Sequence, residues 1–153
     1  MMPLKKGDEC PTFQLKNQFD QLVDITDYLG RRNLVIFFYP KDETPGCTKE
    51  ACAFRDDFEE FLKYDCELFG ISSDSVQNHL SFSKNHNLPY NLLADEDKAI
   101  RKLFGVPANL FGLIPGRVTY IISKKGLVEE IFNSQTNPIG HINSALKTLQ
   151  GMI

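Results

Sequence analysis

Two cysteines, Cys47 and Cys52, lie five residues apart in a segment whose sequence predicts the start of a helix. Thr44 is a typical N-cap residue, and Pro45 suits the first helical position, where an N–H group has no partner within the helix. Cys47 would then lie in the first helical turn, where unpaired N–H groups and the positive end of the helix dipole favour a thiolate. A thiolate at a helix start, with a second cysteine one turn further on, indicates redox chemistry.

The spacing of these two cysteines also sets a condition on any disulfide between them. Five residues along an ideal helix separate two Cα atoms by roughly 8–9 Å. A disulfide needs Cα atoms within about 7 Å of each other. We therefore expect that a bond between Cys47 and Cys52 requires the first turns of the helix to unwind.

The elements that must position this segment alternate along the chain. Predicted strands cover 13–15, 22–24, 34–39, 66–72, 92–94, 117–122 and 127–132, and predicted helices cover 45–62, 75–85, 95–104 and 138–149, with a helical turn at 27–29. Strand–helix–strand units imply parallel pairing, and the last two strands form a hairpin around Gly126. We predict an α/β, thioredoxin-like fold: a mixed central β-sheet flanked by helices on both faces, with a short N-terminal β-hairpin. One domain is expected to span residues 1–153.

A longer pattern surrounds the first cysteine. The motif Pro40-x-x-x-Thr44-x-x-Cys47 resembles the signature of peroxiredoxins, the AhpC/TSA-like thiol peroxidases built on a thioredoxin fold. The string from Tyr39 to Asp56 is similar to one subgroup, peroxiredoxin Q, also called bacterioferritin comigratory protein. Further matches extend along most of the chain: Phe13 after Pro11, Gly70-Ile71-Ser72, Leu92-Leu93-Ala94-Asp95, Phe104-Gly105-Val106 and Arg117.

The resemblance implies a role for each matched residue of the site. Cys47 would be the peroxidatic cysteine, which attacks a peroxide oxygen and becomes a sulfenic acid. Thr44 would hydrogen-bond the peroxide, and Arg117 would polarise the thiolate and the leaving oxygen. Pro40 would shield the thiolate from solvent, and the N–H groups of Gly46 and Cys47 would hold the substrate. Preorganised donors of this kind stabilise the charge that moves to the leaving oxygen.

Cys52 would be the resolving cysteine, which forms an intrachain disulfide with Cys47. A second thiol reverses a sulfenic acid, whereas further oxidation is mostly irreversible. The implied enzyme is a thioredoxin-dependent peroxiredoxin for antioxidant defence and redox homeostasis. It would reduce hydrogen peroxide and organic hydroperoxides and be recycled by a thioredoxin- or glutaredoxin-type reductant. No cofactor or metal is expected, because sulfur carries out the redox step.

The remaining residues of interest have structural interpretations. Cys10 and Cys66 are interpreted as small buried hydrophobes. Glu50 either positions Arg117 or simply occupies the first turns of the helix, and both interpretations stay open. Ligand spacing for a metal is missing around the three histidines, which are His79, His86 and His141.

Composition and charge limit the partners and the compartment. The net charge is −3, from 17 basic and 20 acidic residues without a basic block, which argues against nucleic acid as a partner. No stretch approaches the length of a membrane span. An N-terminus without an apolar signal and four cysteines without a disulfide framework predict a cytoplasmic protein; a removed organelle transit peptide would leave no trace. We expect a monomer, with a weak dimer as the alternative.

Two other functions stay open. A thiol–disulfide oxidoreductase would favour a Cys-x-x-Cys pair, whereas four residues separate Cys47 from Cys52. A redox-sensing adaptor or holdase without enzymatic activity would use the apolar loop 106–116 as a binding patch. We favour packing of this loop into the core.

Overall fold

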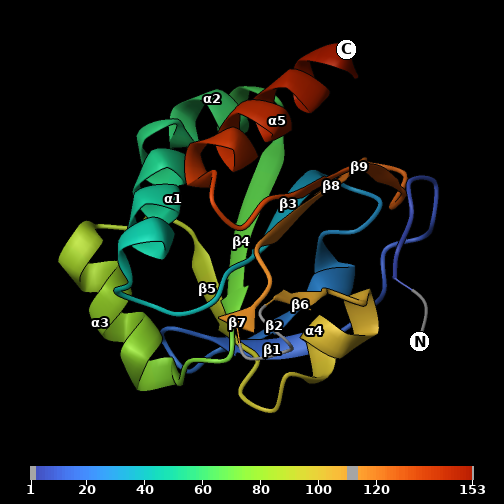
Figure 1. Cartoon of the computed structure of the whole chain (residues 1–153). Coiled ribbons are helices and arrows are strands. Elements are labelled where there is room, and N and C mark those ends of the chain that lie inside the picture. Colours follow the sequence, from blue (N-terminus) through green and yellow to red (C-terminus); the bar gives the residue numbers. More distant parts are fainter. Residues whose placement is uncertain (1–2, 110–113, 153) are drawn as a thin grey trace.

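A mixed sheet forms the centre of the fold in the computed structural model, which describes residues 3–109 and 114–152 (Figure 1). In that part of the chain the sheet has seven strands in the order β2-β1-β5-β4-β3-β8-β9. The strands are β1 (Gln14–Asn17), β2 (Leu22–Asp24), β3 (Asn33–Phe38), β4 (Cys66–Ser72), β5 (Asn91–Ala94), β8 (Val118–Ile122) and β9 (Val128–Asn133). The pairs β3–β4 and β4–β5 are parallel, and the other pairs are antiparallel, including the N-terminal hairpin β1–β2.

Helices cover both faces of the sheet, as predicted. One face carries α1 (Pro45–Asp56), α2 (Phe58–Lys63), α3 (Val76–His86) and α5 (Pro138–Gly151), and the opposite face carries α4 (Ala99–Phe104) and the 3-10 helix η1 (Ile25–Asp27) (Figure 1). Among the described residues no helix combines the length and apolar character needed to cross a bilayer.

Strand β3 is apolar from Leu34 onward because both of its faces are covered. Val35, Phe37 and the following Tyr39 belong to the core beneath α1 and α5. The alternate residues Ile36 and Phe38 belong to the core on the α4 side. This alternation is the period-two geometry of a strand. It brings the chain out of the sheet at Tyr39, directly before the loop that leads to α1.

The predicted helix over 45–62 is two helices in the structure. Asp57 separates α1 from α2 with φ −101° and ψ 13°, and its N–H group donates to Ala53 O. Aspartate is a poor residue for a helix interior, and the run Asp56-Asp57 places two together. The single-helix prediction was therefore wrong in its second half.

Two loops also differ from expectation. The helical turn predicted at 27–29 begins earlier, because the Asp24 carboxylate accepts the Thr26 N–H and starts η1 at Ile25. Loop 106–116 contains a small antiparallel pair, β6 (Ala108–Asn109) with β7 (Ile114–Pro115). Val106 packs against the core as predicted. Leu110, Phe111 and Leu113 lie outside the described residues, so the packing predicted for them stays a prediction.

Candidate active site

Cys47 lies in the first turn of α1 and is almost completely buried, with 2% of its surface exposed. All four cysteines of the chain are thiols in this structure. The helix begins at Pro45, and Thr44 is its N-cap residue with extended backbone angles. The Cys47 sulfur therefore lies beside the unpaired N–H groups of a helix start, as the sequence predicts.

Thr44 occupies the cap position, but its side chain does not cap the helix. Its hydroxyl instead donates to Lys41 O at 2.7 Å, and only its carbonyl oxygen enters the helix, by accepting the Thr48 N–H at 2.8 Å. The N-cap predicted at Thr44 is thus confirmed in position and backbone conformation, without the side-chain hydrogen bond of a typical cap. Because the hydroxyl proton is directed at Lys41, the hydroxyl oxygen still has lone pairs with which to accept a hydrogen bond.

Arg117 reaches the Cys47 sulfur from the sheet, 70 residues later in the chain. It directly precedes β8, whose first residue Val118 pairs with Phe38 at the end of β3. The Arg117 side chain is buried, its Nη2 lies 3.6 Å from Cys47 Sγ, and its Nη1 donates to Glu50 Oε1 at 2.7 Å. The sheet register therefore places the guanidinium at the start of α1.

Gly46 allows this approach. A Cβ atom at Gly46 would lie 3.0 Å from Arg117 Nη2, closer than ordinary van der Waals contact. The residue before the cysteine therefore has to be small for Arg117 to reach the sulfur.

Glu50 is fully buried between a cation and a neutral imidazole. Burial raises the pKa of Glu50 to about 8, although the Arg117 guanidinium acts in the opposite direction. Its Oε2 has no hydrogen-bond partner among the described residues, and His141 Nδ1 lies 3.6 Å away. The hydrogen bond from Arg117 bears on the question that the sequence left open: Glu50 contacts Arg117 directly and so can position it.

His141 is held in one tautomer. Its Nε2 faces Ser134 O at 2.8 Å and must donate a proton to it, so its Nδ1 accepts from the Thr119 hydroxyl at 2.7 Å. Burial lowers the pKa of His141 to about 4, which keeps the ring neutral at neutral pH. The imidazole therefore adds no second positive charge beside Arg117.

The loop before α1 is anchored by a buried acid. The Asp42 carboxylate accepts from the Tyr39 hydroxyl at 2.6 Å and lies 2.6 Å from His79 Nδ1, while the Asp42 N–H donates to Asp74 at 2.8 Å. His79 Nε2 is directed at a backbone carbonyl of β5. Sequence spacing gave no sign of this group, because its members come from three separate segments.

Pro40 lies two residues beyond the end of β3 and is half-buried. Together with Pro115 it lines a surface cavity of about 460 Å³, next to the segment that carries Arg117. Its predicted shielding of Cys47 stays a prediction.

Cys52 lies on the same continuous helix as Cys47 and is partly exposed. Beyond Cys47 the helix is tied down at two points: the Tyr90 hydroxyl donates to Ala51 O at 2.7 Å, and Arg55 donates to His86 O at 2.7 Å. The two cysteines are therefore held apart by an intact helix, and the predicted unwinding stays a prediction.

Cys10 and Cys66 are buried away from these residues. Burial raises the pKa of Cys10 to about 12 and that of Cys66 still further above its ordinary value. Both remain thiols at neutral pH, which agrees with their interpretation as small hydrophobes.

Comparison of the sequence and structure with known proteins identifies the family of this chain. The AhpC/TSA family matches residues 6–131, which is most of the chain. The chain belongs to the AhpC/TSA family. Its curated relatives include "Peroxiredoxin Q, chloroplastic" from Gentiana triflora, 50% identical over 147 residues (96% of this chain and 67% of the relative), and from Populus jackii, 48% identical over 149 residues (97% and 70%).

Solved structures give the same result. The peroxidoxin BcpB of Mycobacterium tuberculosis superposes with a TM-score of 0.90 and 34% identity, covering 98% of this chain and 99% of that one. A mutant of Xylella fastidiosa PrxQ gives a TM-score of 0.90 with 26% identity and 99% coverage of both chains. The thioredoxin-like fold and the peroxiredoxin Q assignment are confirmed, and the protein is a thiol peroxidase, an oxidoreductase.

The predicted cytoplasmic location is contradicted. The curated peroxiredoxin Q relatives from Populus jackii, Gentiana triflora and Arabidopsis thaliana are all named chloroplastic. A folded peroxidase domain carries no physical feature that fixes its compartment, since organelle import depends on a separate targeting segment. Reasoning from the residues of the domain could not have found this.

Proposed function

We propose that this peroxiredoxin reduces hydrogen peroxide and organic hydroperoxides at Cys47 and resolves the product through an intrachain disulfide with Cys52. The observation that carries the proposal is the Arg117 guanidinium, whose Nη2 lies 3.6 Å from a Cys47 sulfur in the first turn of α1. A buried arginine and a helix start both favour the thiolate, which is the reactive form of a cysteine.

In the first step the Cys47 thiolate attacks one oxygen of the peroxide. The O–O bond breaks, a sulfenic acid forms on Cys47, and the second oxygen leaves and takes up a proton as water or an alcohol. The Thr44 hydroxyl accepts a hydrogen bond from the peroxide, since its own proton is directed at Lys41 O. Arg117 and the N–H groups of Gly46 and Cys47 stabilise the charge on the leaving oxygen.

In the second step the Cys52 thiolate attacks the sulfenic sulfur. The S–S bond forms, the sulfenic oxygen leaves as hydroxide and is protonated to water, and the first turns of α1 open to allow the contact. A dithiol reductant of the thioredoxin or glutaredoxin type then exchanges with the disulfide and restores both thiols.

The relatives supply the remaining parts of the proposal. A solved structure of the Xanthomonas campestris bacterioferritin comigratory protein, 30% identical with a TM-score of 0.83 over 92% of this chain and 91% of that one, is described by its alkyl peroxide reduction activity. We extend that substrate class to this chain. The chloroplastic relatives point to a plastid as the place of action. We further propose a monomeric unit over residues 1–153.

Peroxide consumption in the presence of a thioredoxin or a glutaredoxin recycling system tests the proposal. We expect turnover of hydrogen peroxide and of an organic hydroperoxide in wild type, no reaction in Cys47→Ser, and a single equivalent without turnover in Cys52→Ser. Cys66→Ala is the matched control, because Cys66 is a buried thiol in the same core, and it should turn over normally. Insulin reduction without peroxide consumption would instead identify a thiol–disulfide oxidoreductase.

A further inference from the structure

Arg101 of α4 connects the two chain segments that form the site. It is buried, with 7% of its surface exposed. Its Nη1 donates to Gly116 O at 2.8 Å, and its Nη2 donates to Tyr39 O at 2.9 Å. Gly116 directly precedes Arg117, and Tyr39 directly precedes Pro40. One guanidinium therefore holds both the segment before β8, which contains Arg117, and the loop that leads to Cys47.

These two carbonyls lie where the sheet no longer joins the two segments. The ladder between β3 and β8 ends at the pair Phe38–Val118. The next residues beyond this pair are Tyr39 on one segment and Arg117 on the other. Beyond that point Tyr39 still bonds to β4 through its N–H, which donates to Ile71 O at 3.1 Å. The Arg101 fork thus takes the place of the next hydrogen bonds between β3 and β8.

The Arg101 side chain is itself fixed in place. Its guanidinium lies over the Phe38 ring, 5.6 Å from the ring centroid. The Asp95 carboxylate accepts the Arg101 backbone N–H at 2.9 Å and so holds the start of α4. The Phe38 ring and the two carbonyl acceptors therefore hold the guanidinium in one place.

We propose that Arg101 is a positioning residue for the peroxidase reaction, which sets the distance between Arg117 and the Cys47 loop by bridging Gly116 O and Tyr39 O. The proposal rests on the proposed function of Cys47 and Arg117. A planar fork can bridge two carbonyls at fixed separation, whereas a lysine ammonium is a point donor without that geometry. The role therefore depends on the shape of the side chain as well as on its charge.

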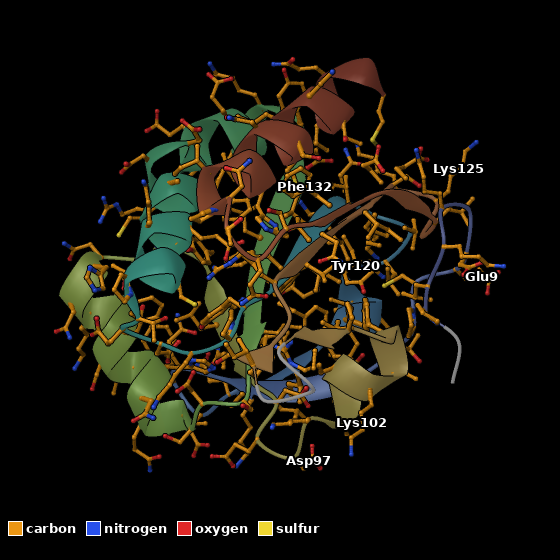
Figure 2. All side chains as sticks on the ribbon, viewed as in Figure 1. Glu9, Asp97, Lys102, Tyr120, Lys125 and Phe132 are labelled. Carbon is orange, nitrogen blue, oxygen red and sulfur yellow. The ribbon has the colours of Figure 1, made fainter. Side chains whose placement is uncertain are left out.

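The test compares Arg101→Met and Arg101→Lys with Lys102→Met, all in a Cys52→Ser background that isolates Cys47. Lys102 is the matched control, because it is the next residue of α4 and points into solvent (Figure 2). Three quantities are measured at neutral pH: the single-turnover rate with hydrogen peroxide, the rate of Cys47 alkylation by iodoacetamide, and the ultraviolet thiolate absorbance.

We expect Arg101→Met to react with peroxide more slowly by up to about a hundredfold, because a misplacement of about 1 Å can cost that much. Alkylation should fall much less, because it needs no alignment of an O–O bond with Arg117. Arg101→Lys, which keeps the cation but not the planar fork, should recover only part of the peroxide rate, and thiolate absorbance reports whether loss of the cation changes Cys47. Lys102→Met should match the parent in all three.

A peroxide rate in Arg101→Met equal to that of Lys102→Met would overturn the proposal. An equal loss of peroxide and alkylation rates would also overturn it, because general loosening of the fold would then explain both. If Arg101→Met fails to fold, a folded Arg101→Lys variant with the full peroxide rate would show that the bridge from the guanidinium to Gly116 O and Tyr39 O is not needed. Peroxide consumption that persists in Cys47→Ser would refute the proposed function alone, since alkylation and thiolate absorbance still report the effect of Arg101 on Cys47.

Discussion

Arg117 uses all three guanidinium nitrogens: Nη1 donates to Glu50, Nη2 lies beside Cys47, and Nε donates to Gln135 O at 3.2 Å. The hydrogen bonds to buried Glu50 and to Gln135 O together hold the guanidinium plane in one orientation. The nitrogen beside the sulfur is thereby preorganised for charge that develops on a leaving oxygen.

Arg117→Lys tests this division at the residue scale. A single ammonium cannot satisfy Glu50 and face the sulfur with the same geometry, so we expect the peroxide rate constant to fall about 10²-fold. Because the chain contains no Trp, competition with a haem peroxidase for limiting peroxide is a suitable measurement. Arg32→Lys is the control, since Arg32 forms its ion pairs with Asp65 and Glu67 away from the site. A full rate in Arg117→Lys would contradict the orienting role of the fork.

Sequence reasoning found the reactive residues more easily than their supports. Cys47 and Arg117 follow from a motif and a strand position, and the structure brings them together. The partner of Glu50 lies 67 residues away in sequence, so spacing alone could not assign its role. The direction of the Thr44 hydroxyl could not be read from the sequence, because it depends on one nearby carbonyl, Lys41 O. Arg101 is missed altogether, since it looks like an ordinary helix residue until Gly116 and Tyr39 meet in space.

At the scale of elements, α1 has to be stable for activation and unstable for resolution. Its first turns surround Cys47, while Ala51, just before the resolving cysteine, is anchored by the Tyr90 hydroxyl. The strength of that anchor contributes to the population of the unwound helix in which Cys47 and Cys52 can meet.

Tyr90→Phe should therefore speed disulfide formation. Loss of one hydrogen bond costs the folded helix about 1 kcal/mol, which would raise the unwound population about fivefold. The measurement is the rate at which the Cys47 sulfenic acid converts to disulfide after a peroxide pulse, followed by rapid quenching and mass spectrometry.

Tyr120→Phe is the control for this prediction. Its hydroxyl makes a 3.5 Å contact with Phe104 O on the opposite face of the sheet (Figure 2), and its loss should leave the resolution rate unchanged. Equal resolution rates in wild type and Tyr90→Phe would show that unwinding at Ala51 does not limit the step.

The order and type of the main elements could be read from apolar periodicity, whereas their boundaries depended on single polar groups. The break between α1 and α2 at Asp57 and the earlier start of η1 at Ile25 both arise from aspartates. At Asp24 the carboxylate accepts a backbone N–H group, and at Asp57 the low helix propensity of aspartate favours the break. Neither effect is visible in the apolar pattern.

At the scale of the whole molecule, the sheet order joins residues from distant segments into one site. Placing β8 beside β3 brings Arg117 to Cys47, and α5 then covers the site with His141. The alternation of strands and helices predicted the mixed sheet. The burial of His141 between α5 and the sheet depends on how the two pack together, which the alternation does not reveal. The single domain over 1–153 stays a prediction.

Burial of neutral His141 makes the free energy of unfolding fall as the pH is lowered. Its folded pKa is about 4, below the ordinary 6.5, so between these values the unfolded chain binds a proton that the folded chain does not. This contribution is fully present above pH 6.5 and is lost as pH falls toward 4, up to about 3 kcal/mol. The raised pKa of Glu50 makes the folded protein more stable at acidic pH, which is the opposite trend. Glu50 is present in both wild type and a His141→Gln variant, so its contribution largely cancels when their free energies of unfolding are compared.

Urea unfolding of wild type and His141→Gln at several pH values tests the contribution of His141. We expect the stability advantage of wild type to shrink by about 3 kcal/mol from neutral pH to pH 4. His86→Gln, which alters a partly exposed histidine paired with Glu43, should show no comparable loss. Parallel pH curves for wild type and His141→Gln would contradict burial of a neutral ring.

The most direct test of the division of labour between Cys47 and Cys52 is mass spectrometry after one equivalent of peroxide. Wild type, Cys47→Ser and Cys52→Ser are each treated, quenched with a sulfenic acid probe and digested. The account predicts a Cys47–Cys52 disulfide in wild type, a trapped sulfenic acid on Cys47 in Cys52→Ser, and no oxidation in Cys47→Ser. A wild-type disulfide that involves Cys10 or Cys66 would contradict it.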